Sequence, residues 1–165
     1  MNLVLKKRSH LWWGETLLPC TWGRGGIRED KKEGDGATPI GVFPFRKVFY
    51  RADRLAAPKT CLPLSPLTPQ DGWCDDVADS AYNKLIQKPY EGRHEDLWRV
   101  DHLYDIVLVV GHNDDPFVKG EGSAIFVHLR RPESTPTDGC VALDLQDLLK
   151  ILAEATPKSC LIVEN

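Results

Sequence analysis

The sequence predicts a single, mainly β domain of the β-rich α+β class. Short apolar runs recur along the chain, and each is bounded by glycine, proline or polar turn residues, which is typical of strands. The 12 prolines and 13 glycines are scattered, so they indicate turns between strands rather than a disordered region. With 165 residues, 42% of them hydrophobic, the chain is long enough to bury one core.

The first third of the chain is predicted to be short strands around one long loop. Leu3 and Leu5 alternate with Val4 and Lys6, and residues 16–22 form a second apolar run. The glycine-rich stretch 23–36 is expected to be a loop. Residues 38–45 look extended, and their prolines predict an edge strand or a segment that lines a groove.

The middle of the chain, residues 56–104, has a different character. Prolines at positions 58, 63, 66 and 69 exclude long regular elements in its first part. A short helix is predicted over residues 79–87. A connection of this length usually has its own function, so we expect an insertion that acts as a lid or substrate wall of the same domain.

The last third is more regular. Strands are predicted over residues 105–111, 123–129, 141–143 and 159–163. Between the last two, Asp144 is positioned to cap a helix that runs to Ala155. The apolar face of this helix consists of Leu145, Leu148, Leu149 and Leu152.

Charge and cysteine content exclude several classes of protein. The formal net charge is −3, whereas a non-specific nucleic-acid binder is normally basic, so no nucleic-acid partner is expected. No CxxC pair exists among the five cysteines, and neither they nor His94 and His102 have metal-ligand spacing, so no metal or organic cofactor is expected. Four cysteines are interpreted as buried small hydrophobic residues: Cys20, Cys61, Cys74 and Cys160.

The N-terminus predicts the compartment. Its apolar stretch is too short for a signal peptide, and its charges follow that stretch rather than precede it. No window approaches a transmembrane span. We therefore expect a cytoplasmic monomer with reduced thiols, the alternative being a periplasmic protein whose leader is not part of this sequence.

The strongest chemical signal lies between His128 and Cys140. The histidine ends an apolar strand and the cysteine follows a short polar loop, so a loop that folds back can bring the two side chains together. An imidazole within hydrogen-bond reach converts a thiol to a nucleophilic thiolate near neutral pH. Gly139 allows a sharp backbone turn, which leaves amide N–H groups free to hold an oxyanion.

The motifs resemble the L,D-transpeptidase catalytic domain (YkuD-like) family. The matching residues are His128 with the sequence Thr137-Asp138-Gly139-Cys140, the run Asp35-Gly36-Ala37-Thr38-Pro39-Ile40-Gly41, and the strand Gly122-Ser123-Ala124-Ile125-Phe126-Val127-His128. Residues 111–116 and 73–76 resemble a small, compact branch of that family. The resemblance runs from about Gly23 to Ala155, and it implies a compact, sandwich-like or barrel-like pair of sheets.

The resemblance also implies an acyl-transfer cycle. Cys140 would attack the carbonyl between an L-centre of a peptidoglycan stem peptide and the following D-amino acid, and His128 would move the proton. The carbonyl of Leu129 would orient the imidazole, and the amides near Asp138, Gly139 and Cys140 would form the oxyanion hole.

Two departures from the family pattern concern substrate binding. Many relatives have histidine where this chain has Asp138, and a carboxylate there raises the thiol pKa unless it points away or pairs with Arg130 or Arg131. Many relatives also have arginine soon after the cysteine, whereas Val141 follows here, so Arg130 and Arg131 are candidate substitutes or else a solvated pair. The substrate-binding set is predicted to be Thr137, Arg130, Asn113 and Trp73.

Residues 112–116 and Trp73 have simpler interpretations as well. The first could bind a cation through its oxygens, although a polar turn with Asn113 facing the groove is favoured. Trp73 and Trp98 are more often packing residues, but in a lid they would wall a substrate cleft.

The function predicted from these features is cysteine-dependent L,D-carboxypeptidase activity, which trims tetrapeptide muropeptides during cell-wall recycling. The preference for trimming follows from the expected cytoplasmic location, because cross-linking takes place outside the membrane. Cross-linking by an L,D-transpeptidase is the alternative within the class. A catalytically silent peptidoglycan-binding or peptide-binding module is the alternative from another class, and Asp138 beside the thiol favours it. A papain-like protease is disfavoured because there the nucleophile precedes its base.

Overall fold

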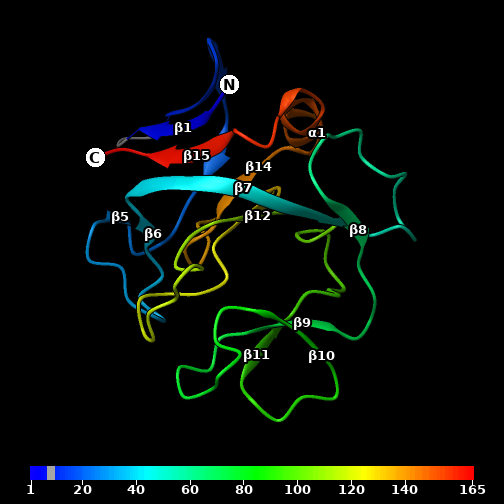
Figure 1. Ribbon diagram of the computed structural model, residues 1–165. Helices are drawn as coiled ribbons and strands as arrows, with labels where there is room; N and C mark the ends of the chain where they lie inside the picture. The colour runs from blue at the N-terminus through cyan, green and yellow to red at the C-terminus, as the bar shows by residue number, and fades with distance from the viewer. Residues whose placement is uncertain (7–9) are drawn as a thin grey trace.

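The computed structural model describes residues 1–6 and 10–165, which form one large sheet, two small sheets and a helix (Figure 1). In chain order the elements are β1 (Leu3–Lys6), β2 (His10–Trp13), β3 (Thr16–Leu18), β4 (Cys20–Thr21), β5 (Ile27–Arg28), β6 (Thr38–Pro39), β7 (Gly41–Tyr50), β8 (Leu64–Pro66), β9 (Asp71–Cys74), β10 (Leu85–Gln87), β11 (His94–Asp96), β12 (Ile106–Val110), β13 (Phe126–Leu129), β14 (Val141–Leu143), α1 (Leu145–Glu154) and β15 (Cys160–Val163). No described helix has the length and apolar character that crossing a bilayer requires.

The large sheet closes almost completely into a barrel-like shape. Its strand order is β3-β2-β1-β15-β7-β12-β13-β14-β4, with β8 paired to β7. The end strands β3 and β4 are separated in sequence only by Pro19, so the two ends of the sheet must lie near each other. The main core includes Leu3 and Leu5, whose alternation predicted β1. The expected β-rich class with a barrel-like sheet is confirmed.

Helix α1 packs its apolar face into the same core. Leu148, Ile151 and Leu152 are completely buried, in agreement with the predicted helix after residue 143. Asp144 holds the N-cap position with extended backbone, but its side chain makes no capping hydrogen bond. Arg130 instead donates two hydrogen bonds to this carboxylate, which explains why the expected cap is absent.

The prediction that residues 38–45 form an edge strand is wrong for most of the segment. Strand β7 lies between β15 and β12 in the middle of the large sheet. Pro44 is tolerated there because its pairing uses only its carbonyl, which accepts the N–H of Gly111, while Phe45 supplies the N–H that bonds to Ser159. The pairing with β12 also shifts register between Val109 and Val110.

The predicted helix at residues 79–87 is wrong as well. The segment forms successive turns and then strand β10. The Asp79 side chain accepts the backbone N–H of Ala81, and Asn83 has φ = +59°, which is incompatible with a continuing helix. The Asp79 side chain thus stabilises a turn, and Asn83 adopts a turn conformation, so no helix forms over this segment.

Two further strands are shorter than predicted. Residues 16–22 divide at Pro19 into β3 and β4, at opposite ends of the large sheet. Residues 123–125 precede β13 instead of belonging to it, and Ala124 has φ = +52°. A non-glycine residue with that φ is uncommon, and here its carbonyl accepts the S–H of Cys140.

The inserted segment 56–104 forms a separate small sheet, in the order β10-β9-β11, drawn in green in the lower part of Figure 1. Strand β8, at its beginning, joins the large sheet by pairing with β7. A buried cluster that includes Leu97, Tyr104, Phe126 and Cys140 packs the end of this segment against the large sheet.

Candidate active site

Strands β13 and β14 bring His128 and Cys140 to one side of the sheet. The two strands are parallel neighbours, with His128 paired to Ala142 and Val127 paired to Val141. Cys140 lies two positions before Ala142, so the side chains at both positions point to the same face as the imidazole. Both His128 and Cys140 are buried, and both line the same cleft.

The Cys140 thiol is held by backbone groups of the segment that precedes β13. Its S–H donates to the carbonyl of Ala124, with a sulfur–oxygen distance of 3.2 Å, and its sulfur accepts the N–H of Phe126 at 3.3 Å. Burial raises the pKa of this thiol, and the nearby charge of Glu95 raises it further. Burial and the charge of Glu95 thus favour the protonated thiol in the free protein.

The His128 imidazole is neutral and has a defined tautomer. Its Nδ1 lies 2.8 Å from the carbonyl oxygen of Leu129, and a carbonyl can only accept, so Nδ1 carries the proton and Nε2 has a free lone pair. Burial lowers the pKa of His128 to about 4. No hydrogen bond joins the imidazole to the Cys140 thiol within residues 1–6 and 10–165. Burial thus favours the neutral forms of both groups in the free protein.

The loop before Cys140 is fixed by side chains that cross it. Thr137 Oγ1 donates to the Cys140 carbonyl at 2.6 Å and accepts the N–H of Gly139 at 3.2 Å. Thr38 Oγ1 donates to the Gly139 carbonyl at 2.7 Å and accepts the N–H of Gly23 at 2.9 Å. The Gly139 amide is thus occupied, whereas those of Asp138 and Cys140 make no hydrogen bond to any described residue.

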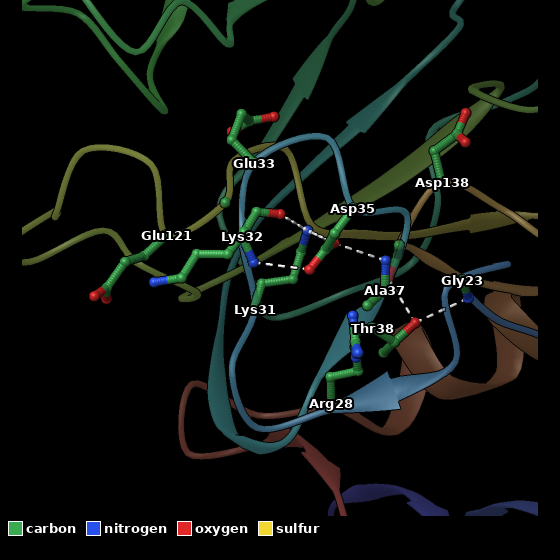
Figure 2. Close-up of polar contacts among 12 residues, drawn as sticks. Gly23, Arg28, Lys31, Lys32, Glu33, Asp35, Ala37, Thr38, Glu121 and Asp138 are labelled. Carbon is green, nitrogen blue, oxygen red and sulfur yellow. Dashed lines mark hydrogen bonds and ion pairs between the residues drawn. The ribbon is translucent and has the colours of Figure 1, made fainter.

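Gly139 is required by its conformation and by its neighbours. Its φ is +133°, and a Cβ at this position would lie 2.8 Å from the carbonyl oxygen of Ala37. Ala37 is itself held because its N–H donates to Asp35 Oδ1 at 2.8 Å. Figure 2 shows this bond, together with the one from Gly23 to Thr38.

Asp138 pairs with a residue that sequence analysis did not connect to it. Arg24 Nε lies 2.7 Å from Asp138 Oδ1, and both side chains are largely exposed. Neither Arg130 nor Arg131 is the partner. Asp138 still adds to the rise in the Cys140 pKa, but it contributes less than Glu95 does.

The cleft has a volume of about 620 Å³, and three parts of the chain build its walls. Loop residues that include Lys31 and Glu33 form one side, and the loop after His128 forms another. The inserted segment contributes the remaining wall, which consists of Asp75, His94, Glu95, Arg99, Leu103 and Tyr104. Cavities of this size typically hold one ligand of drug-like dimensions.

Tyr104 and Glu95 link this wall to His128 and Cys140, and nothing in the sequence pattern indicated them. The Tyr104 ring packs edge-on against the His128 ring, with 5.1 Å between their centroids. Its hydroxyl donates to Glu95 Oε1. Arg99 lies over the Tyr104 ring, with its guanidinium carbon 5.2 Å from the ring centroid. Only long-range packing brings these residues to the site.

Thr21 is a further residue of the cleft that the sequence did not indicate. It pairs with Ala142, which in turn pairs with His128, so the three residues form a row across β4, β14 and β13. Among the described residues, Thr21 Oγ1 is the buried side-chain oxygen without a hydrogen-bond partner. A buried hydroxyl normally has a partner, so this row is a candidate contact for substrate or water.

The structure does not bring Trp73 and Asn113 into this cleft. Trp73 lines a second cavity of about 250 Å³, where it packs edge-on against Phe126 and donates from Nε1 to Asn83. Asn113 organises its own loop, because its side chain bonds to backbone groups of Val118 and Gly122. The hydrogen-bonding groups of the Trp73 and Asn113 side chains thus bond to other protein groups outside this cleft.

Thr137, Arg130 and Arg131 do line the cleft. Thr137 uses its hydroxyl to hold the loop, and Arg130 is bound to Asp144 through two hydrogen bonds. Arg131 is exposed and forms no ion pair with any described residue. It is therefore the arginine of this loop that remains available for a carboxylate.

The other cysteines differ from expectation. Cys74 is buried, but Cys20 and Cys160 are half-buried and Cys61 is exposed, so the prediction of four buried residues is wrong for three of them. All five cysteines are free thiols. Within the described ranges no group of three His, Cys, Asp or Glu side chains is arranged to hold a metal ion.

Comparison with known families agrees with this geometry. Residues 3–163 match the family model YkuD, described as the L,D-transpeptidase catalytic domain. A search of curated proteins gave no significant match. The matched range includes the large sheet, the inserted segment and the loop that carries Cys140.

Proposed function

The chain belongs to the YkuD family of L,D-transpeptidase catalytic domains, which act on peptidoglycan, and we propose that it is an L,D-carboxypeptidase that trims stem peptides through a thioester on Cys140. The observation that carries this proposal is the fixed tautomer of His128. Because Leu129 holds the Nδ1 proton, Nε2 is free to take a proton from a thiol in the same cleft.

The proposed cycle begins when substrate enters the cleft: the Cys140 S–H bond turns away from the Ala124 carbonyl, and its proton passes from the sulfur to His128 Nε2. The sulfur forms a bond to the carbonyl carbon between the L-centre and the terminal D-amino acid. The amides of Asp138 and Cys140 are the donors available for the oxyanion. The carbon–nitrogen bond then breaks, and the imidazolium gives its proton to the departing amine.

The second half of the cycle restores the thiol. Water loses a proton to His128 Nε2 and attacks the thioester carbonyl, which breaks the carbon–sulfur bond. The shortened stem leaves with a free carboxyl group, and the proton held on the imidazole returns to the sulfur. No cofactor is needed for any of these steps.

The size of the cleft favours water over a second stem peptide as the acceptor. Its volume of about 620 Å³ is in the range for a single ligand, whereas cross-linking requires the amine of another stem beside the first. Arg131 also supports the proposal, since an arginine with no protein carboxylate partner suits the terminal carboxylate of the D-amino acid. Cross-linking remains the second candidate, because it would use the same thioester.

The proposed function is tested with a disaccharide tetrapeptide, incubated with and without a second amine-bearing stem, followed by mass spectrometry. Trimming predicts loss of one D-alanine in both reactions with no dimer. A dimer in the second reaction would identify the protein as a cross-linking transpeptidase. No change in either reaction would refute the enzymatic proposal and favour a binding module.

A further inference from the structure

The ion pairs in the cleft leave specific charges uncompensated. Four of its cations are bound by carboxylates: Arg24 by Asp138, Lys31 by Asp35, Arg99 by Asp101 and Arg130 by Asp144. Of its four acidic side chains, Asp138 and Asp75 are paired with arginines. Glu33 and Glu95 are bound only by neutral hydroxyl groups within the described residues. Two carboxyl groups in the cleft thus have no ion-pair partner in the protein.

Of these two, Glu95 is the one whose charge acts on the thiol. It is half-buried, and its Oε1 accepts the hydroxyl of Tyr104. Its other oxygen, Oε2, makes no hydrogen bond to any described side chain or amide. Arg99 is the nearby cation, but both of its bonds go to Asp101, at 2.8 and 2.7 Å. Burial raises the pKa of Glu95, and the negative charges of Asp75 and Asp138 raise it further, so a cation supplied from outside the protein would stabilise its carboxylate.

An ionised Glu95 opposes the proposed reaction as it begins. The charge of Glu95 raises the pKa of Cys140 more than that of any other ionisable group does. Thiolate and oxyanion both carry negative charge in the same cleft, and like charges in a partly dry site repel strongly. A positive group that arrives with the substrate would remove this repulsion, whereas a neutral N–H donor would only weaken it.

We propose that Glu95 is a specificity-determining residue that receives an ammonium group of the substrate next to the bond that Cys140 attacks. The inference rests on the proposed acyl transfer by Cys140, and it adds a requirement for charge to that reaction. A substrate with the ammonium group compensates Glu95 and so permits the thiol to lose its proton. A substrate without it binds beside an uncompensated carboxylate and reacts slowly.

The test compares the wild type with Glu95→Gln, which retains the acceptor oxygen for Tyr104 but has no charge. The matched control is Asp96→Asn, which removes the same charge from the next residue of β11. Asp96 is 58% exposed and does not line the cleft; it pairs with Lys88 at 2.6 Å and lies 3.8 Å from His94 Nε2. The substrates are two synthetic tetrapeptide stems with lysine in the third position, one with a free side-chain amine and one with that amine acetylated.

Two readouts separate specificity from general damage. The first is the kcat/KM for release of the terminal D-alanine. The wild type and Asp96→Asn should prefer the free amine by about tenfold, which corresponds to one charge-assisted contact. Glu95→Gln should lose this preference. The second readout is the rate at which neutral iodoacetamide alkylates Cys140 without substrate, measured on the Cys140 peptide. Glu95→Gln should react several-fold faster than the other two proteins.

Faster alkylation together with retained turnover of the acetylated stem is the signature of the proposed role, because misfolding would expose the buried thiol but would abolish turnover of both stems. Equal turnover of the two stems by the wild type would overturn the inference and leave trimming intact. Unchanged or slower alkylation in Glu95→Gln would overturn it as well. If the wild type releases D-alanine from neither stem, the proposed function fails, and the alkylation rates alone then decide whether Glu95 controls the thiol.

Discussion

His128 Nδ1 lies 2.8 Å from the carbonyl oxygen of Leu129, the residue that follows it in the same strand. This contact fixes both the ring orientation and the tautomer, because the carbonyl can accept only a proton-bearing nitrogen. The lone pair on Nε2 is consequently available in the cleft. The Leu129 carbonyl thus orients the imidazole, as the aspartate carboxylate does in a Ser-His-Asp triad.

The pH dependence of turnover should show a neutral imidazole as the base. Burial lowers the pKa of His128 to about 4, so the ring remains deprotonated and active at all higher pH values. The kcat/KM should fall as the pH decreases through about 4, since protonated His128 cannot accept the thiol proton. A pH–rate profile measured on a tetrapeptide stem checks this, and an acid limb at the ordinary histidine value of 6.5 would contradict it.

The resting thiol should be unreactive toward simple alkylating agents. Burial raises the pKa of Cys140 above the usual 9.0, and only the thiolate reacts rapidly. At pH 7 iodoacetamide should modify the exposed Cys61 first, and Cys140 should follow only as the pH rises above 9. Peptide mapping after timed alkylation gives both rates. Preferential labelling of Cys140 at pH 7 would instead indicate the resting thiolate that sequence analysis predicted.

Replacement of Gly139 by alanine should abolish most of the activity. The new Cβ would lie 2.8 Å from the Ala37 carbonyl, so the loop would have to move and carry Cys140 with it. Gly120→Ala is the matched control, because Gly120 also has positive φ but has open space around the Cβ position. Each change costs about 1–2 kcal/mol for the backbone conformation. Gly139→Ala should lose at least about tenfold more turnover than the control, and equal losses would show that the clash has no role.

Asp138 should affect the thiol more than it affects the fold. Its pair with Arg24 is exposed, so Asp138→Asn should leave the thermal unfolding temperature unchanged. Removal of the charge should lower the Cys140 pKa slightly, because Asp138 contributes to its rise. The pH midpoint of Cys140 alkylation measures this effect. A midpoint that moves upward would mean that Asp138 assists ionisation rather than opposing it.

The parts of the site that sequence predicted lie within one strand–loop unit. His128 lies in β13 and Cys140 immediately precedes β14, and because the two strands are paired neighbours, both residues reach the same site. Trp73 instead lies in the inserted segment, and Asn113 lies in the loop between β12 and β13 that its own side chain organises. Glu95 and Tyr104 reach the cleft only through the packing of the inserted segment, which has no periodic signal in the chain.

The strands were predictable where a local pattern of residues identifies them. The predictions were wrong where particular backbone or side-chain contacts decide the structure. Alternation of buried and exposed residues identified β1, and an apolar run identified β12. Pro44 was misleading because proline usually marks an edge strand, yet here only its carbonyl takes part in pairing. The side-chain hydrogen bond at Asp79 and the positive φ of Asn83 account for the absence of the helix predicted over residues 79–87.

Intact-protein mass spectrometry during turnover of a tetrapeptide stem tests most directly whether Cys140 is the nucleophile. The account predicts a transient adduct with the mass of the stem less its terminal D-alanine, located on Cys140 and absent from Cys140→Ala, which should also release no D-alanine. Release of D-alanine by Cys140→Ala at the wild-type rate would contradict the account, as would an adduct on any other residue.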